Sequence, residues 1–187
     1  MATIVPDARA AGANRTRPGR VVGIDPGLNV TGYAVLEPAA DRSAGAGPIV
    51  VEAGVIRSGG AATTLGARLD TLYQGVLEVL DAFPPMALAL EQVHSHGKHP
   101  RTAILMAHAR GVIVLAAARR GVPVVGYAAA RIKKTLTGSG KAPKEQMQHA
   151  IRTELGLDRL PEPHDVADAC AVAICHFQID RNRLGLG

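Results

Sequence analysis

The stretch covering residues 165–178 constrains the fold of this chain more than any other. After Asp168 it reads Ala169-Cys170-Ala171-Val172-Ala173-Ile174-Cys175, without a charged side chain. We predict a helix here, and a helix that is apolar all round is normally buried. Asp165 and Asp168 stand at the entrance to that buried helix and need partners, because an unpaired buried charge costs on the order of several kcal/mol. Basic side chains or a divalent cation could supply them.

The rest of the chain alternates between strand-like and helix-like patterns. Apolar runs bounded by turn residues predict strands over residues 21–24, 31–37, 49–57, 86–90 and 122–127. Apolar residues spaced by three or four predict helices over residues 64–82, 101–120, 129–136, 143–155 and 165–178. Short connections between the first three strands suggest an antiparallel meander. We therefore expect an α/β fold with a five-stranded mixed sheet flanked by helices.

The length of 187 residues suits one ordinary domain. We expect it over residues 20–178, between a disordered N-terminal tail (1–19) and a flexible basic C-terminal tail (179–187). Cys170 and Cys175 form no disulfide framework and are predicted to be buried thiols, which fits a reducing, cytoplasmic setting. No apolar run approaches the ~20 residues of a membrane span, so no membrane association is expected.

The positive charge of the chain is concentrated in one stretch. The net charge is +5, but residues 92–144 contain no Asp or Glu and ten Lys or Arg, so this stretch is +10 and the remainder is −5. Such asymmetry suits a polyanion, whose phosphates attract a basic face at long range. A solvated surface with uneven charge is the alternative. The ten residues are Lys98, Arg101, Arg110, Arg119, Arg120, Arg131, Lys133, Lys134, Lys141 and Lys144.

Four acids stand where acids are least expected. Asp25 closes a strand that would be central in such a sheet, and Glu91 closes another apolar strand. Ligands of open α/β sheets tend to bind at strand ends. Asp165 and Asp168 are three apart on a helix, so both project to one face. We expect these four acids to form one site.

Each acid also has a simpler explanation. Asp25 could stabilise the turn that follows it, Glu91 could lie exposed at a sheet edge, and the two helical acids could favour the positive end of the helix dipole. These explanations weaken when all four residues must be explained together. Hard oxygen ligands suit Mg²⁺ or Mn²⁺. Two such ions, typically ~3.5–4 Å apart, can activate a water and stabilise the leaving oxygen of a phosphodiester.

Six short motifs together indicate a family. In chain order they are Gly23-Ile24-Asp25-Pro26-Gly27, Thr31-Gly32-Tyr33, Leu90-Glu91-Gln92-Val93, Ala109-Arg110-Gly111-Val112, Ala128-Ala129-Ala130-Arg131-Ile132-Lys133 and His164-Asp165-Val166-Ala167-Asp168-Ala169. With these motifs in this order and spacing, the chain resembles the RuvC family of Holliday-junction resolvases over roughly residues 21–177. One motif alone would be weak, whereas the set in register is specific.

This resemblance implies a fold, an activity and a set of site residues. It implies a ribonuclease H-like fold and a homodimer that nicks two opposed strands of a four-way DNA junction in recombination and repair. It implies branch-migration partners, the RuvA and RuvB proteins. The family's catalytic carboxylates fall here on Asp25, Glu91, Asp165 and Asp168, the four acids at which we expect Mg²⁺ or Mn²⁺, with two ions per site. Family lysines that contact DNA phosphates match Lys133 and Lys144.

Further DNA contacts are expected at Arg131, Lys134, Lys141, His94, Lys98 and Arg101. His94 departs from the family pattern, which often has a Phe there that stacks near the junction centre. An imidazole can stack on a base, but it offers less surface and can be charged. His94, His96 and His99 lack the paired spacing of common zinc sites, so phosphate contact or simple exposure is favoured over a separate metal site.

Other classes of function fit the sequence less well. An actin-like ATPase or sugar kinase also places a turn after Asp-x-Gly, but its duplicated second domain does not fit in 187 residues. A non-catalytic nucleic-acid-binding module would be favoured by the loss of an acid, and all four positions are filled. A related nuclease acting on RNA is the nearer alternative, because a basic face alone cannot distinguish DNA from RNA.

The expected substrate also predicts an assembly. A four-way junction has two-fold symmetry and needs two opposed cuts, so two copies related by a two-fold axis are the simplest arrangement. Our candidate interface is the helix predicted over residues 101–120. The candidate interface residues at helical spacing could equally face the protein's own core. They are Ile104, Leu105, His108, Gly111, Val112 and Leu115.

Overall fold

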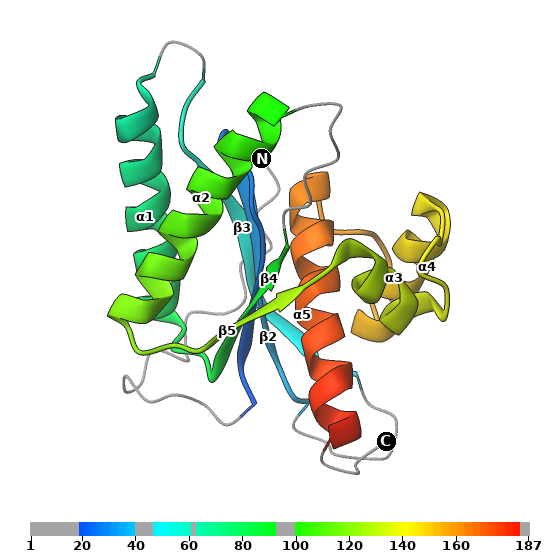
Figure 1. Ribbon diagram of the computed structural model, residues 1–187. Helices are drawn as coiled ribbons and strands as arrows, with labels where there is room; N and C mark the ends of the chain where they lie inside the picture. The colour runs from blue at the N-terminus through cyan, green and yellow to red at the C-terminus, as the bar shows by residue number, and fades with distance from the viewer. Residues whose placement is uncertain (1–18, 40–46, 61–62, 93–99, 184–187) are drawn as a thin grey trace.

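The computed structural model describes residues 19–39, 47–60, 63–92 and 100–183 (Figure 1). Residues 1–18 of the predicted N-terminal tail and residues 184–187 of the predicted C-terminal tail lie outside these ranges. The division of the chain into two tails and one domain therefore stays a prediction.

A five-stranded mixed sheet forms the middle of the molecule. Its strand order is β3-β2-β1-β4-β5, so β1 (Val21–Asp25) is central. β2 (Val30–Glu37) pairs antiparallel with β1 and with β3 (Ile49–Arg57), whereas β4 (Ala87–Glu91) pairs parallel with β1 and with β5 (Val124–Tyr127). These pairings confirm the predicted mixed sheet and its antiparallel meander.

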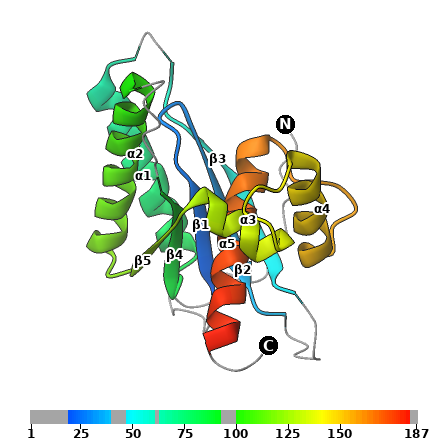
Figure 2. The same cartoon turned by 45° about the vertical axis from the view of Figure 1, so that its right-hand side comes forward.

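Helices cover both faces of this sheet. α1 (Leu65–Ala82) and α2 (Pro100–Arg119) lie on one face, and α5 (His164–Arg183) lies on the other (Figures 1 and 2). α3 (Ala129–Thr137) and α4 (Lys144–Leu155) pack against α5. Every strand and helix predicted from the sequence is present, with boundaries shifted by a few residues.

α5 is buried as its composition predicts. Ala169 to Cys175 are all buried between the sheet and the pair α3 and α4, and Cys170 and Cys175 are free thiols. The predicted end of this helix at residue 178 is wrong, because α5 continues to Arg183. The residues after 178 contain no Gly or Pro before Gly185, so nothing in the sequence stops the helix earlier.

α2 is apolar over most of its length. By length and mean hydropathy alone, its residues from Arg101 to Arg119 are long and apolar enough to cross a membrane. A charged residue, Arg110, interrupts this apolar stretch, so it contains no uninterrupted apolar run of that length. Ala109 and Ile113 pack into the core under α1, whereas Ile104 and Leu115 are 57% and 53% exposed. Among the described residues, α2 thus carries an apolar outer face without a cover.

Candidate active site

The alternation of side chains along the strands places Asp25 and Glu91 on the face that α5 covers. Val21 on β1 and Ala89 on β4 belong to the core cluster that includes α5. Asp25 lies four residues after Val21, and Glu91 two after Ala89, so both acids point to the same side of the sheet. The parallel register pairs Ile24 with Leu90, which makes the two acids neighbours at the ends of adjacent strands.

Two glycines allow α5 to lie directly on the sheet beside these acids. A Cβ at Gly23 would come within 2.7 Å of the Cβ of Ala173, and a Cβ at Gly32 would overlap the carbonyl oxygen of Asp165. Gly32 is also the cross-strand partner of Asp25. The close approach at Gly32 therefore brings the first turn of α5 next to the end of β1.

The electrostatics of Asp25 indicate that the four acids form one cluster. Burial, followed by the negative charges of Glu91, Asp168 and Asp165, raises the pKa of Asp25 from 3.8 to about 7. A like charge acts strongly on a pKa only within several ångströms. The structure thus brings together all four acids that the sequence singled out, from β1, β4 and α5.

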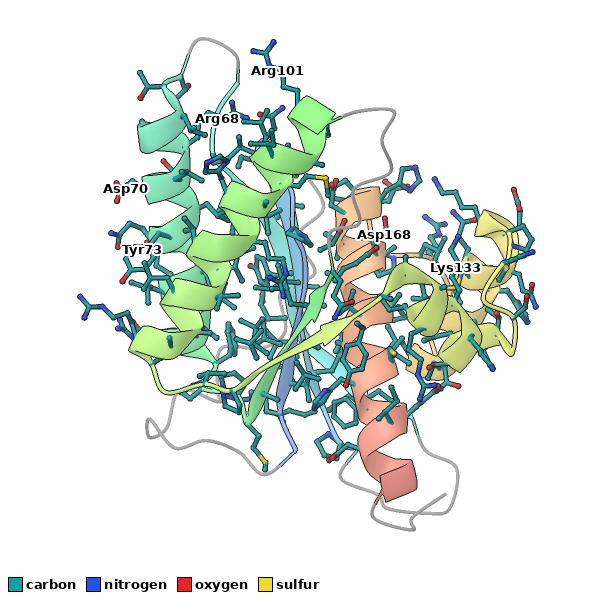
Figure 3. All side chains as sticks on the ribbon, in the orientation of Figure 1. Arg68, Asp70, Tyr73, Arg101, Lys133 and Asp168 are labelled. Atoms are coloured by element: carbon teal, nitrogen blue, oxygen red, sulfur yellow. The ribbon has the colours of Figure 1, made fainter. Side chains whose placement is uncertain are left out.

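Asp168 connects this cluster to the basic residues. Protein atoms around its carboxylate desolvate it and raise its pKa, although part of the side chain is exposed. Lys144 opposes this rise most strongly among the nearby cations, followed by His164 and Lys133. Figure 3 shows Asp168 on α5 with Lys133 on the neighbouring α3. Both lysines predicted to contact phosphates therefore lie beside the acids.

The remaining predicted DNA contacts are placed less closely or not at all. Lys134 and Lys141 are exposed near Lys133 in the chain, and Arg101 is exposed at the start of α2 (Figure 3). Arg131 lies near Cys175, two helical turns along α5 from Asp168. His94 and Lys98 lie outside the described residues.

The chemistry of the cluster suits a hard divalent cation. In the parts of the chain that the structure describes, no three His, Cys, Asp or Glu side chains stand close enough to hold an ion. The donors are all carboxylate oxygens, which Mg²⁺ and Mn²⁺ prefer. A divalent ion would also relieve the repulsion that raises the pKa of Asp25.

Three residues around the cluster were not predicted from the sequence as part of the site. His164 lowers the pKa of Asp168. Gly32 was named only as part of a motif. Thr31 binds the turn after Asp25, since its Oγ1 donates to the carbonyl oxygen of Gly27 at 2.6 Å. The Thr and Gly in the second motif were the available signal, because small and hydroxyl side chains beside an acid often shape a turn.

A central sheet with an acidic cluster at its strand ends, covered by a buried helix that adds two more acids, defines a ribonuclease H-like α/β protein. The chain matches the family described as "Crossover junction endodeoxyribonuclease RuvC" over residues 21–176. The protein therefore belongs to the RuvC family and is a crossover junction endodeoxyribonuclease. This confirms the predicted family and fold. Nucleases of this family are metal-dependent in general.

Individual relatives agree with this assignment. The chain is 48% identical over 169 residues to the RuvC of Rhodopirellula baltica, covering 89% of this chain and 92% of that protein. Its fold is similar to the Thermus thermophilus RuvC structure, with a TM-score of 0.79, 30% identity, and coverage of 89% of this chain and 97% of the other. It is also similar to T. thermophilus RuvC in complex with a Holliday junction substrate, with a TM-score of 0.80, 30% identity, and coverage of 88% and 96%.

Proposed function

We propose that this protein resolves four-way DNA junctions by metal-dependent hydrolysis of phosphodiester bonds in two opposed strands. The observation that carries the proposal is the cluster in which three acids raise the pKa of a fourth, Asp25, with Lys133 and Lys144 beside them. The T. thermophilus relative in complex with a Holliday junction supports the choice of substrate.

Asp25, Glu91, Asp165 and Asp168 would hold Mg²⁺ or Mn²⁺, and we propose two ions per site. Such ions, when bound, supply a water nucleophile and stabilise the leaving oxygen. The chain supplies hard oxygen ligands on three elements that the sheet and α5 hold at one place. The pKa of Asp25 is about 7, so its carboxylate is only partly ionised at neutral pH unless positive charge offsets burial and the three neighbouring acids.

Lys133 and Lys144 would bind phosphates next to the one that is cut. Lys133 lies on α3 and Lys144 is the first residue of α4, and both lower the pKa of Asp168. A phosphate that these lysines bind is therefore next to the acids. Exposed Lys134 and Lys141 would extend this basic surface along the DNA backbone.

We further propose a homodimer formed through the outer face of α2. Of the candidate interface residues, Ile104, His108, Gly111 and Leu115 are exposed, whereas Leu105 and Val112 pack against the protein's own core. An added Cβ at Gly111 meets nothing within 4 Å, so a second helix can approach closely there. An apolar helix face with a small residue at its centre suits a second copy of itself in an isologous contact.

We also propose partners and a compartment. On the basis of the family, branch-migration proteins of the RuvA and RuvB type would deliver the junction. The two buried free cysteines are compatible with a reducing cytoplasm, which we propose as the compartment.

The test is a cleavage assay with matched substrates. The protein is incubated with a labelled four-way junction, a duplex and a single strand of the same sequences, and a structured RNA, in EDTA, Mg²⁺ or Mn²⁺. We expect cuts in two opposed strands of the junction, only with a divalent ion. Asp25→Asn is the control that binds the junction without cutting it. Cleavage of the RNA at a comparable rate, or of the junction in EDTA, would contradict the proposal.

A further inference from the structure

The turn that follows Asp25 is held by side chains from distant parts of the chain. Asp25 is the last residue of β1 in register with β2, and residues 26–29 form the turn. Thr31 binds this turn from within: its Oγ1 donates to the carbonyl oxygen of Gly27 at 2.6 Å and accepts from the Gly27 N–H at 3.3 Å. The side chain of Leu28 is buried in the core beneath α1 and α2.

Ser58, just after β3, binds the next part of the turn. Its side chain is buried and its Oγ donates to the carbonyl oxygen of Leu28. Its backbone N–H donates to the carbonyl oxygen of Asn29 at 3.1 Å. The backbone of the turn is thus fixed on the side of β3.

Arg68 binds the turn from α1. Its Nη2 donates to Oδ1 of Asn29, across 39 residues of sequence. Arg68 lies in the first turns of α1, which covers the face of the sheet opposite to α5 (Figure 1). Its Nε is buried, with no hydrogen-bond partner among the described residues. The hydrogen bond that the structure gives this guanidinium is therefore the one to Asn29.

We propose that Arg68 is a positioning residue for the metal site, which acts through Asn29 to hold the turn and so the carboxylate of Asp25. The inference rests on the proposed function, since it assumes that Asp25 is a metal ligand. Three other acids repel Asp25 when it is ionised, and that repulsion favours backbone arrangements that move Asp25 away. A turn fixed by Arg68 resists this movement, so the carboxylate of Asp25 loses less conformational freedom when an ion binds.

The action of Arg68 is through contact and not through its charge. The charges that shift the pKa of Asp25 are those of Glu91, Asp168 and Asp165. If Arg68 acts through Asn29, removing either residue should give the same defect, and removing both should give no more than one. Loss of an outer partner of this kind typically lowers metal affinity or activity by roughly 10- to 100-fold.

The experiment compares Arg68→Ala, Arg68→Lys, Asn29→Ala and the double Ala variant with the unaltered protein. Two quantities are measured: the Mn²⁺ concentration for half-maximal junction cleavage, and the junction affinity in EDTA with its salt dependence. We expect the Mn²⁺ requirement to rise about tenfold or more in both single Ala variants and equally in the double variant. Arg68→Lys should fall between, and junction affinity in EDTA should stay unchanged.

Arg120→Ala is the matched control. It removes an arginine that binds α1 at its other end, where Nη2 of Arg120 donates to Oδ2 of Asp81 at 2.7 Å. It should leave the Mn²⁺ requirement unchanged. Asn29→Ala keeps the proposal testable if Arg68→Ala does not fold.

Several results would overturn the inference. A loss of junction affinity and a smaller salt slope in Arg68→Ala alone would make Arg68 a phosphate contact. Additive defects in the double variant, or an unchanged Mn²⁺ requirement, would remove the link through Asn29. If the unaltered protein failed to cut junctions with any ion, the proposed function itself would fail, which is distinguishable from these outcomes.

Discussion

Gly32 of β2 lies directly against the backbone of Asp165 of α5. A Cβ at Gly32 would overlap the carbonyl oxygen of Asp165, and Gly32 is the cross-strand partner of Asp25. The absence of a side chain at one position on β2 therefore sets how closely the acids of α5 approach the acid of β1. The site depends on this approach, because ligands on separate elements must meet around one ion.

Gly32→Ala should displace the first turn of α5 and impair the site. The obstructing atoms are backbone, so the helix has to shift, and overpacking of this kind costs about 1–3 kcal/mol of stability. We expect a lower Tm and a cleavage rate reduced well beyond what partial unfolding explains. Gly66→Ala is the control, since its Cβ meets nothing within 4 Å and Ala suits a helix better than Gly. Equal rates in both variants would show that the close approach at Gly32 is unimportant.

Each of the four acids should be needed for cleavage but not for binding. Asp25→Asn, Glu91→Gln, Asp165→Asn and Asp168→Asn should each slow junction cleavage by about 100-fold or more, equivalent to ~2.7 kcal/mol. Junction affinity should be largely kept, because it comes mostly from phosphate contacts elsewhere. The measurement is single-turnover cleavage beside a binding titration in Ca²⁺-free EDTA buffer. A variant that cuts within a few-fold of the normal rate would remove that residue from the site.

Asp25 should make stability depend on pH when no divalent ion is present. Burial and the neighbouring acids raise its folded-state pKa from 3.8 to about 7, so the folded protein keeps this proton to higher pH than the unfolded chain does. Stability is therefore lost progressively between about pH 4 and pH 7, and the loss is complete above that. In Asp25→Asn this loss should be absent, so the Tm difference between variant and parent grows over that interval in EDTA.

Divalent ions should reverse this difference. An ion that binds the folded state alone raises its stability, so Mn²⁺ at neutral pH should raise the Tm of the parent more than that of Asp25→Asn. A Tm difference that stays constant from pH 4 to pH 7, with or without Mn²⁺, would mean that the carboxyl of Asp25 is not held as described.

Lys133 and Lys144 should contribute to the salt dependence of junction binding. Each phosphate contact releases condensed counterions, so Lys133→Ala and Lys144→Ala should each lower the slope of log affinity against log salt by about 0.9 on duplex arms. Arg119→Ala is the control, because Arg119 is the exposed last residue of α2, and α2 lies on the face of the sheet opposite to α5 (Figure 1). A slope in the double Lys variant equal to that of Arg119→Ala would place these lysines away from the DNA.

A charge on the outer face of α2 should separate the proposed dimer. Leu115 is 53% exposed, so Leu115→Glu should leave the fold of one copy intact while placing a charge in the interface. Analytical ultracentrifugation at micromolar concentration should give a dimer for the parent and a monomer for the variant. Ile49→Glu, on the edge strand β3 and at 48% exposure, should remain dimeric. A monomeric parent, free and on a junction, would exclude the dimer.

The sequence by itself determined the elements and the identity of the acids. Strands and helices were readable because their apolar spacing is a local property, and the all-apolar run from Ala169 to Cys175 required a buried helix, which the structure has. The four acids stood out because strand ends and the entrance to a buried helix are costly places for a charge. The central position of β1 also followed from the pattern.

The tertiary structure decided what depends on distances across the chain. Periodicity could not tell which apolar residues of α2 face the core, because its composition is apolar on both sides and the outcome depends on what packs there. The contact of Gly32 with Asp165, the bond of Arg68 to Asn29 and the raised pKa of Asp25 join residues far apart in sequence. Such contacts depend on the sheet register and on the position of α5 against the sheet. The spacing of apolar residues describes a single element and not how two elements pack together.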